Sequence, residues 1–236
     1  MKPWDDPRIA RGMKAQLEKR RARIVAGEQP LGWKVGFGAP AALETLQISA
    51  PVVGYLMQSS LLIPGSAVSL QGWIKPVAEP EIAVRMGSDL GAAPSPDAVT
   101  AAIRDIRPAI ELADLNLAPA PDNLEQIIAD DIFHRHVLLS PIARTGASTV
   151  DLTSRVERRG TEVARTTDPE ALTGKVVDIV AHVASTLAAF GEKLAAGDVV
   201  ITGSITPPLM IEPDEPGIRH TIDPIGDVSV VFAQTA

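Results

Sequence analysis

Hydrophobic residues recur every four positions near the N-terminus, which is the spacing of one face of an amphipathic helix. Acidic residues followed by a proline precede them, and a glycine follows them, as is favourable for the two ends of a helix. We therefore expect an N-terminal helical segment over about residues 5–27. Its hydrophobic positions are Ile9, Met13 and Leu17.

Further along the chain, short apolar runs alternate with glycine and proline, a texture typical of β-rich regions. No regular alternation of strands and helices is present, so the pattern predicts an α+β fold built on mixed sheets, in one domain over 1–236. The proline-rich stretch 207–216 is expected to be an ordered active-site loop. We expect helices at 95–105, 122–130 and 176–194, strands at 31–37, 109–115, 199–202, 219–222 and 228–232, and a hairpin at 156–166.

The composition of the chain limits the classes of partner and of catalytic site that the protein can have. The formal net charge of −7 argues against nucleic acid or an anionic membrane as a partner, because both are bound through clustered positive charge. The chain has no cysteine, which excludes disulfides, thiolate metal sites and cysteine nucleophiles. No stretch approaches the roughly 18 apolar residues of a membrane span. We expect a cytoplasmic protein that acts on small molecules.

Two glutamates flank a proline in the segment 77–84. Side chains alternate along a strand, so Glu79 and Glu81 point the same way. Pro80 cannot donate a ladder hydrogen bond, which predicts an edge strand or an irregular one. Two carboxylates on one face repel each other unless a cation lies between them, and oxygen ligands favour Mg²⁺ or Mn²⁺. A solvated strand face is the alternative reading of the same spacing.

A third glutamate lies in an apolar run. Glu111 stands between Ile110 and Leu112, and an unpaired buried carboxylate would cost several kcal/mol. It should therefore bind a metal or pair with an arginine such as Arg107 or Arg135. If Glu79, Glu81 and Glu111 share one cavity, their pKa values should be raised by mutual repulsion unless a basic group neutralises them.

Five ordered blocks resemble the 2-keto-4-pentenoate hydratase and 4-oxalocrotonate decarboxylase group of the fumarylacetoacetate hydrolase superfamily. They cover most of the chain, from about residue 8 to the end. The blocks are Gly32-Trp33-Lys34-Val35-Gly36, Ala78-Glu79-Pro80-Glu81-Ile82-Ala83, Pro108-Ala109-Ile110-Glu111-Leu112-Ala113-Asp114, Ile128-Ala129-Asp130 and Gly197-Asp198-Val199-Val200-Ile201-Thr202-Gly203-Ser204.

This resemblance implies a mixed β-roll, a homo-oligomer, and a Mg²⁺ or Mn²⁺ ion held by the three glutamates. It also implies that Lys34 faces the substrate and that Thr202 and Ser204 line its carboxylate end. We expect burial to lower the pKa of Lys34 towards the range useful for proton transfer. Asp114 and His134 are further candidates for substrate binding.

The chain also departs from the group's pattern. The acidic pair that usually follows a Gly-x-Leu step is replaced by Gln58-Ser59, and the usual Ser-Arg becomes Leu115-Asn116. Small polar residues give way to bulkier ones over 131–136, which include His134 and His136. If this segment faces the pocket, it should favour a larger or doubly acidic substrate.

The hypothesis is a divalent-metal-dependent lyase that hydrates or decarboxylates a small 2-oxo or 2-hydroxydienoic acid through a metal-stabilised enolate. One alternative is a hydrolase that cleaves a C–C bond of an acylpyruvate-type substrate. That reaction normally needs a His–Glu pair to activate water, and the sequence offers no clear match. The other alternative is a family member that binds metal or acids without turnover.

Overall fold

The computed structural model describes residues 2–233, and its first long element is the helix expected at the N-terminus. Helix α1 (Pro7–Val25) begins where the Asp6 side chain accepts a hydrogen bond from the backbone N–H of Arg8 at 2.8 Å. Its buried face includes Met13 and Leu17, so the hydrophobic spacing is confirmed.

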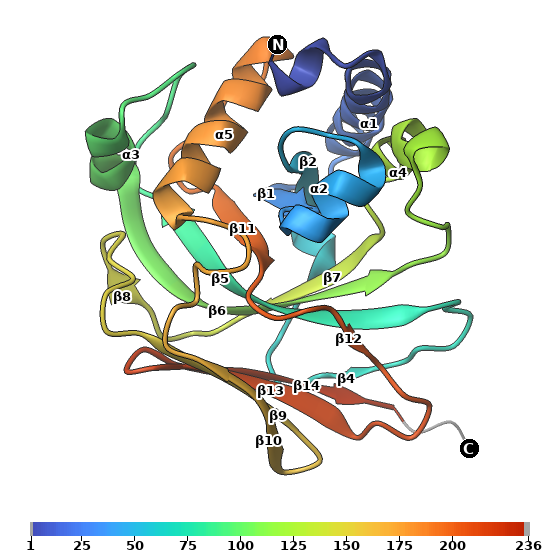
Figure 1. Ribbon diagram of the computed structural model, residues 1–236, viewed down its shortest axis with the longest axis vertical. Coiled ribbons are helices and arrows are strands. Elements are labelled where there is room, and N and C mark those ends of the chain that lie inside the picture. Colours follow the sequence, from blue (N-terminus) through green and yellow to red (C-terminus); the bar gives the residue numbers. More distant parts are fainter. Residues whose placement is uncertain (1, 234–236) are drawn as a thin grey trace.

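A large, curled sheet forms the centre of the molecule (Figure 1). Its strand order is β2-β1-β11-β5-β6-β7-β3, with β12 paired to β5 and β8 paired to β6. Most neighbours are antiparallel, but β1 runs parallel to β11 and β3 parallel to β7. The strands are β1 (Pro30–Gly36), β2 (Val52–Met57), β3 (Leu61–Leu62), β5 (Pro76–Met86), β6 (Ile103–Asp114), β7 (His134–Leu139), β8 (Arg144–Thr145), β11 (Val199–Ser204) and β12 (Leu209–Met210).

A smaller sheet packs against the large one, on the side opposite the helices (Figure 1). Its strand order is β10-β9-β13-β14-β4, and the expected hairpin is β9–β10. Apolar residues of both sheets, among them Ile110, Ile218 and Val230, form one cluster between them. The strands are β4 (Ala67–Val68), β9 (Thr153–Arg158), β10 (Thr161–Thr166), β13 (Gly217–Asp223) and β14 (Gly226–Phe232).

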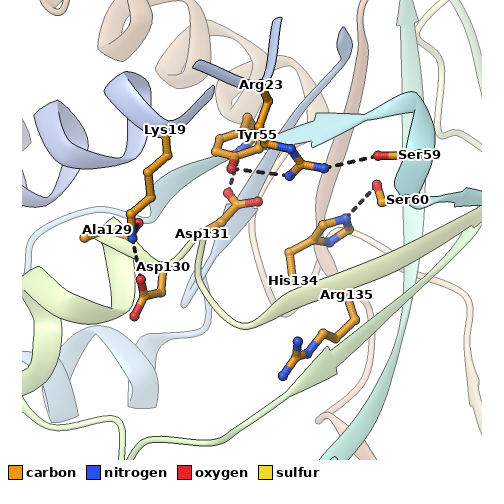
Figure 2. Close-up of a pocket in the computed structure, with 10 residues that line it drawn as sticks. All are labelled: Lys19, Arg23, Tyr55, Ser59, Ser60, Ala129, Asp130, Asp131, His134 and Arg135. Carbon is orange, nitrogen blue, oxygen red and sulfur yellow. Dashed lines mark hydrogen bonds and ion pairs between the residues drawn. The ribbon is translucent and has the colours of Figure 1, made fainter. Parts of the chain in front are cut away.

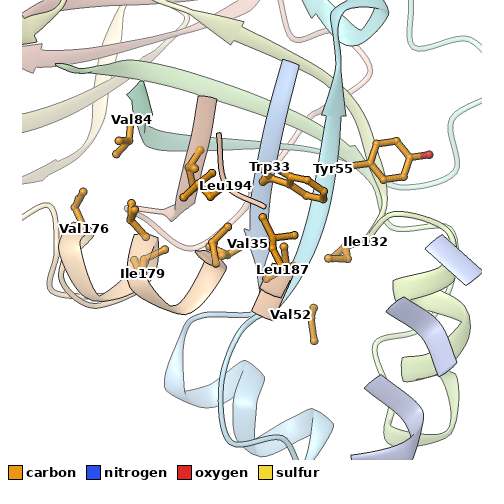
Figure 3. Packing of buried hydrophobic residues seen from close by; sticks show 14 of the residues in the cluster. Trp33, Val35, Val52, Tyr55, Val84, Ile132, Val176, Ile179, Leu187 and Leu194 are labelled. Atoms are coloured by element: carbon orange, nitrogen blue, oxygen red, sulfur yellow. The ribbon is translucent and has the colours of Figure 1, made fainter. Parts of the chain in front are cut away.

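The helices gather on the other face of the large sheet (Figure 1). Val180, Val183 and Leu187 of the longest later helix are fully buried in the core with Trp33 and Val35 of β1 (Figure 3). No helix within residues 2–233 is long and apolar enough to cross a membrane. The helices are α2 (Pro40–Leu46), α3 (Pro96–Ala102), α4 (Leu124–Ala129) and α5 (Val176–Ala189).

The two alternatives for the strand that contains Pro80 have different outcomes. Pro80 does not lie on an edge, because β5 is a central strand between β11 and β6, but the strand pairing beside it is irregular, as the other alternative expected. Proline has no N–H to donate, and beside Pro80 the register of β11 shifts between Ile201 and Ser204, so the regular ladder is interrupted there. The Pro80 carbonyl still accepts a hydrogen bond from the backbone N–H of Ile205 at 2.8 Å. The helix expected at 95–105 ends at Ala102, because the chain passes directly into the long strand β6. The helix expected at 176–194 also ends earlier, at Ala189.

Candidate metal centre and substrate cavity

Three carboxylates converge on adjacent strands of the large sheet. Glu79 and Glu81 lie on β5, and Glu111 lies on β6 directly opposite Glu79 in the antiparallel register. One oxygen of each carboxylate lies within 4.8 Å of the others. Alternation along β5 brings the first two to one face, and strand pairing adds the third.

The backbone of β11 holds Glu81 in place. The N–H of Gly203 donates to Glu81 Oε2 at 2.6 Å, at the point where the β11 register shifts. Gly203 has a φ of 93°, a backbone conformation that glycine adopts without strain. The bulge therefore turns a backbone donor away from the ladder and onto the carboxylate.

The two oxygens of Glu111 have different surroundings. Oε1 accepts from Lys34 Nζ and, at 2.7 Å, from His134 Nδ1. Oε2 is buried and has no hydrogen-bond partner among residues 2–233. The expected alternative, an arginine partner, was wrong: Arg107 pairs with Asp105 and Arg135 with Asp114. A buried carboxylate oxygen left free beside two other carboxylates suits a hard divalent cation.

The pKa values of the three glutamates agree with one shared, buried site. Burial and the nearby Glu111 raise the pKa of Glu79 to about 7. Burial, Glu111 and Glu79 raise the pKa of Glu81 well above its usual range. Burial acts in the same direction on Glu111, but Lys34 and His134 outweigh it and hold its pKa below the ordinary value. The expected repulsion is present, and a basic neighbour neutralises one of the three.

Lys34 reaches this site from β1 and is fully buried. Its Nζ donates to Glu111 and, at 3.1 Å, to the carbonyl of Ile132. Burial lowers the pKa of Lys34, but the carboxylates of Glu111, Glu79 and Asp131 raise it above the ordinary value. The expectation of a lowered ammonium pKa was therefore wrong for the metal-free protein, because the charges around Lys34 favour its protonated form.

A cavity of about 480 Å³ opens next to the three charged residues Lys34, Glu79 and Glu81. Its volume falls in the usual range for small-molecule sites. The rest of the wall comes from helix α2, the turn before β7, and the loops around residues 172–173 and 206–208. This wall is predominantly apolar, and the ring centroids of Phe37 and Phe133 lie 6.2 Å apart in an edge-to-face contact.

Of the four candidate substrate-binding residues, Ser204 alone lines this cavity. Its hydroxyl is buried and has no hydrogen-bond partner within the described part of the chain. Ser204 is paired with Glu81 across the sheet. The Thr202 hydroxyl donates to the carbonyl of Ile82 at 3.0 Å, inside the sheet. The geometry thus suits a ligand contact for Ser204 and a structural contact for Thr202.

Asp114 and His134 have partners elsewhere. Asp114 accepts from the backbone N–H groups of Ile74 and Lys75 at 2.9 and 2.8 Å and pairs with Arg135. His134 lines a second, polar pocket of about 330 Å³, where its Nε2 lies 3.0 Å from Ser60 Oγ (Figure 2). Neither residue lines the large cavity, so this geometry does not favour direct contact of Asp114 or His134 with a substrate there. Their role in substrate binding stays a prediction.

A left-handed turn before β7 separates the two pockets. Asp131, Ile132 and Phe133 have φ values of 62°, 51° and 64°, which is unusual for consecutive residues other than glycine. The side chains of Ile132 and Phe133 line the large cavity, whereas Asp131, His134 and Arg135 line the second pocket. The condition for a larger or doubly acidic substrate, that this segment faces the pocket, is therefore met for Ile132 and Phe133 but not for His134 and Arg135.

Asp131 belongs to the site, although the sequence did not single it out. Its Oδ1 accepts from the backbone N–H of Tyr55 at 2.8 Å (Figure 2). The buried carboxyl lies near Lys34 and raises the pKa of that lysine. Burial raises the pKa of Asp131 to about 8.

The comparison with known families decides the relationship. The model of the fumarylacetoacetate (FAA) hydrolase C-terminal family matches residues 34–231. The chain belongs to the fumarylacetoacetate hydrolase family. The matched range contains all three glutamates and Lys34, and the fold expected from the sequence resemblance is confirmed.

Within this family the chain is similar to lyases of dienoic and oxo acids. It is 29% identical over 226 residues to 2-hydroxyhexa-2,4-dienoate hydratase of Comamonas testosteroni, which covers 92% of this chain and 84% of the relative. It is 26% identical to 4-oxalocrotonate decarboxylase from Pseudomonas putida G7, solved with magnesium and adipate, at a TM-score of 0.84. That match covers 95% of this chain and 86% of the decarboxylase. The expected enzyme class, a metal-dependent lyase, is confirmed at this level.

Proposed function

We propose that this protein is a divalent-metal-dependent hydratase or decarboxylase that acts on a small 2-oxo or 2-hydroxydienoic acid. The observation that supports the proposal most is the convergence of three carboxylates: Glu79 and Glu81 line one end of a small-molecule cavity, and Glu111 lies next to them with a buried oxygen that has no hydrogen-bond partner within residues 2–233. An all-oxygen ligand set suits Mg²⁺ or Mn²⁺. Such an ion would act as a Lewis acid and stabilise negative charge on the 2-oxo oxygen.

The chain's own groups would then position the substrate and move the proton. The Ser204 hydroxyl is available to donate to the substrate carboxylate, because no protein group satisfies it. The Lys34 ammonium stays protonated beside Glu111 and can serve as the proton donor to the developing enolate. The apolar cavity wall excludes water, which strengthens both interactions.

The hydrolase alternative receives less support. Glu111 does have a histidine partner, but His134 lies between Glu111 and Ser60 and lines the second pocket rather than the substrate cavity. A water activated by this imidazole would be on the wrong side of Glu111 from the substrate. The pair therefore serves better to orient the carboxylate.

Ultraviolet absorbance can follow turnover directly. We would test 2-hydroxydienoates, oxalocrotonate and acylpyruvates with purified protein in Mg²⁺ or Mn²⁺. We expect loss of the dienoate or oxalocrotonate chromophore only when metal is present, and none with Glu81→Gln. Turnover of acylpyruvates alone would instead identify a hydrolase, and metal binding without turnover of any compound would identify a non-catalytic member.

A further inference from the structure

The substrate cavity has charge at one end only. Among residues 2–233, the charged side chains that line it are Lys34, Glu79 and Glu81, all carried by strands of the large sheet. The opposite wall is built by α2 and the surrounding loops. It presents Phe37, Phe133 and other apolar side chains, namely Ile132, Leu46, Leu172 and Pro208.

The polar side chains of this wall, Thr45, Thr173 and Thr206, are uncharged hydroxyls, and two of them already donate to backbone carbonyls. Thr45 Oγ1 donates to the carbonyl of Ala41 at 2.7 Å, and Thr206 Oγ1 donates to that of Pro207 at 3.1 Å. Lys34 cannot reach across, because its Nζ is held by Glu111 and the Ile132 carbonyl at the sheet. The wall therefore offers no cation to a second carboxylate.

The left-handed turn at residues 131–133 keeps His134 and Arg135 out of the substrate cavity. It directs Ile132 and Phe133 into the substrate cavity. His134 and Arg135 instead line the second pocket (Figure 2). Arg135 is also paired with Asp114 at 2.9 Å. The two residues that could have bound a distal carboxylate are thus separated from the substrate.

We infer that the substrate is a monocarboxylic 2-oxo or 2-hydroxydienoic acid with an uncharged, apolar tail, and that Phe37, Ile132 and Phe133 select this tail. The inference rests on the proposed function, because it takes the three glutamates to hold the oxo-acid end. A second carboxylate at the tail would be buried against apolar side chains without a partner, and such burial is unfavourable. An apolar tail would instead be removed from water by the same wall.

Two non-reacting acids test the inference by binding alone. Both 2-oxohexanoate and 2-oxoadipate have the same chain length and the same metal-chelating end, and they differ in whether the tail ends in methyl or carboxylate. We would measure their affinities for the Mg²⁺-loaded protein by calorimetry. We expect 2-oxohexanoate to bind about 10-fold or more tightly than 2-oxoadipate, the scale of one misplaced polar contact in a pocket.

A positive charge placed on the apolar wall should reduce this preference. Thr45 is exposed at the rim, so Thr45→Arg is compatible with folding, and Thr45→Gln is the matched neutral control. We expect Thr45→Arg, but not Thr45→Gln, to strengthen 2-oxoadipate binding several-fold. Equal or tighter binding of 2-oxoadipate by the parent protein would overturn the apolar-tail inference while leaving the proposed function intact. Failure of both acids to bind in a Mg²⁺-dependent manner would overturn the proposed function and the inference with it.

Discussion

Lys34 illustrates how surroundings decide the chemistry of one side chain. Burial alone would favour the neutral amine, but three nearby carboxylates favour the ammonium form. The same ammonium neutralises Glu111 and leaves Glu79 and Glu81 with raised pKa values. Lys34 therefore holds one oxygen of Glu111, and in the proposed mechanism it would supply a proton at the end of the cavity where the substrate carbonyl would lie.

Replacement of this lysine should impair turnover more than folding. We expect Lys34→Met to lower kcat by about 10²-fold or more, the usual scale for a proton-transfer group. Lys19→Met is the matched control, since Lys19 is half-exposed and pairs with Asp130 at the second pocket. Steady-state kinetics, with circular dichroism and Mg²⁺ calorimetry on each variant, would check this. A folded, metal-binding Lys34→Met protein with parental kcat would remove Lys34 from the mechanism.

Asp131 should make the stability of the metal-free protein depend on pH. Its pKa is raised to about 8 in the folded state, so the folded protein keeps a proton that the unfolded chain releases near pH 4. Stability contributed by this proton is complete below about pH 4 and is lost as the pH rises to about 8. Asparagine carries no such proton and can still accept from Tyr55 N–H.

We therefore expect Asp131→Asn to stabilise the protein by about 1 kcal/mol or more at neutral pH, with little gain near pH 4. Asp130→Asn is the control, because Asp130 is exposed and its pKa is shifted in the opposite direction. Partial burial raises the pKa of Asp130, but hydrogen bonds from Lys19 and Gln126 outweigh this effect and lower it. Urea unfolding of metal-free protein across this pH interval measures the effect. A gain that did not vary with pH would argue against a buried neutral carboxyl.

The position of strand β1 depends on how closely it approaches β11. The two strands pair in parallel, with Gly32 opposite Val199 and Lys34 opposite Ile201. A Cβ on Gly32 would lie 1.9 Å from the Val199 carbonyl oxygen, and the Gly32 φ of 155° also disfavours a side chain. Two residues further along, β1 presents Lys34 to the three glutamates, so strand spacing and catalytic geometry are coupled.

Gly32→Ala should therefore force β1 away from β11. We expect a loss of about 3 kcal/mol or more in the free energy of unfolding, at the upper end for overpacking, because backbone rather than a flexible side chain is in the way. Gly91→Ala is the matched control, since its Cβ would meet no atom within 4 Å. Denaturant unfolding of both variants would test this, and equal stabilities would show that β1 can shift without cost.

The whole molecule concentrates unfavourable charge at the centre of its large sheet. Glu81 and Glu111 are almost completely buried, and the pKa of Glu79 is raised to about 7 by burial and by Glu111. A bound cation would relieve this repulsion in the folded state but not in the unfolded chain. Metal binding should therefore stabilise the fold as well as prepare the site for catalysis.

We expect Mg²⁺ at a concentration of 100 times its Kd to add about 2.7 kcal/mol to the free energy of unfolding. Because a protonated Glu79 cannot bind the ion, the affinity for Mg²⁺ should rise as the pH increases through about 7. Thermal unfolding at several Mg²⁺ concentrations on each side of that pH is the measurement. Glu81→Gln should lose most of the Mg²⁺ effect, whereas Glu162→Gln, on the exposed hairpin strand β10, should keep it. An equal response from both variants would place the ion elsewhere.

Local sequence patterns were sufficient for much of the fold and for part of the site. The four-residue hydrophobic spacing predicted α1, and alternation on one strand predicted that Glu79 and Glu81 share a face. An acidic residue inside an apolar run predicted that Glu111 needs a partner. These predictions succeeded because each depends only on residues close together in the chain, whose relative directions follow from helix or strand geometry.

Tertiary structure decided which groups meet across the sheet and which pocket each residue faces. The partners of Glu111 are Lys34 and His134, although Arg107 is nearer in the sequence. Pro80 is tolerated in a central strand because β11, more than a hundred residues later in the sequence, has a bulge beside it. At this bulge the ladder does not need the N–H that proline lacks. The left-handed turn at 131–133 distributes adjacent side chains between two pockets. Strand order, register shifts and positive φ angles depend on packing between distant segments, so they cannot be predicted from local periodicity.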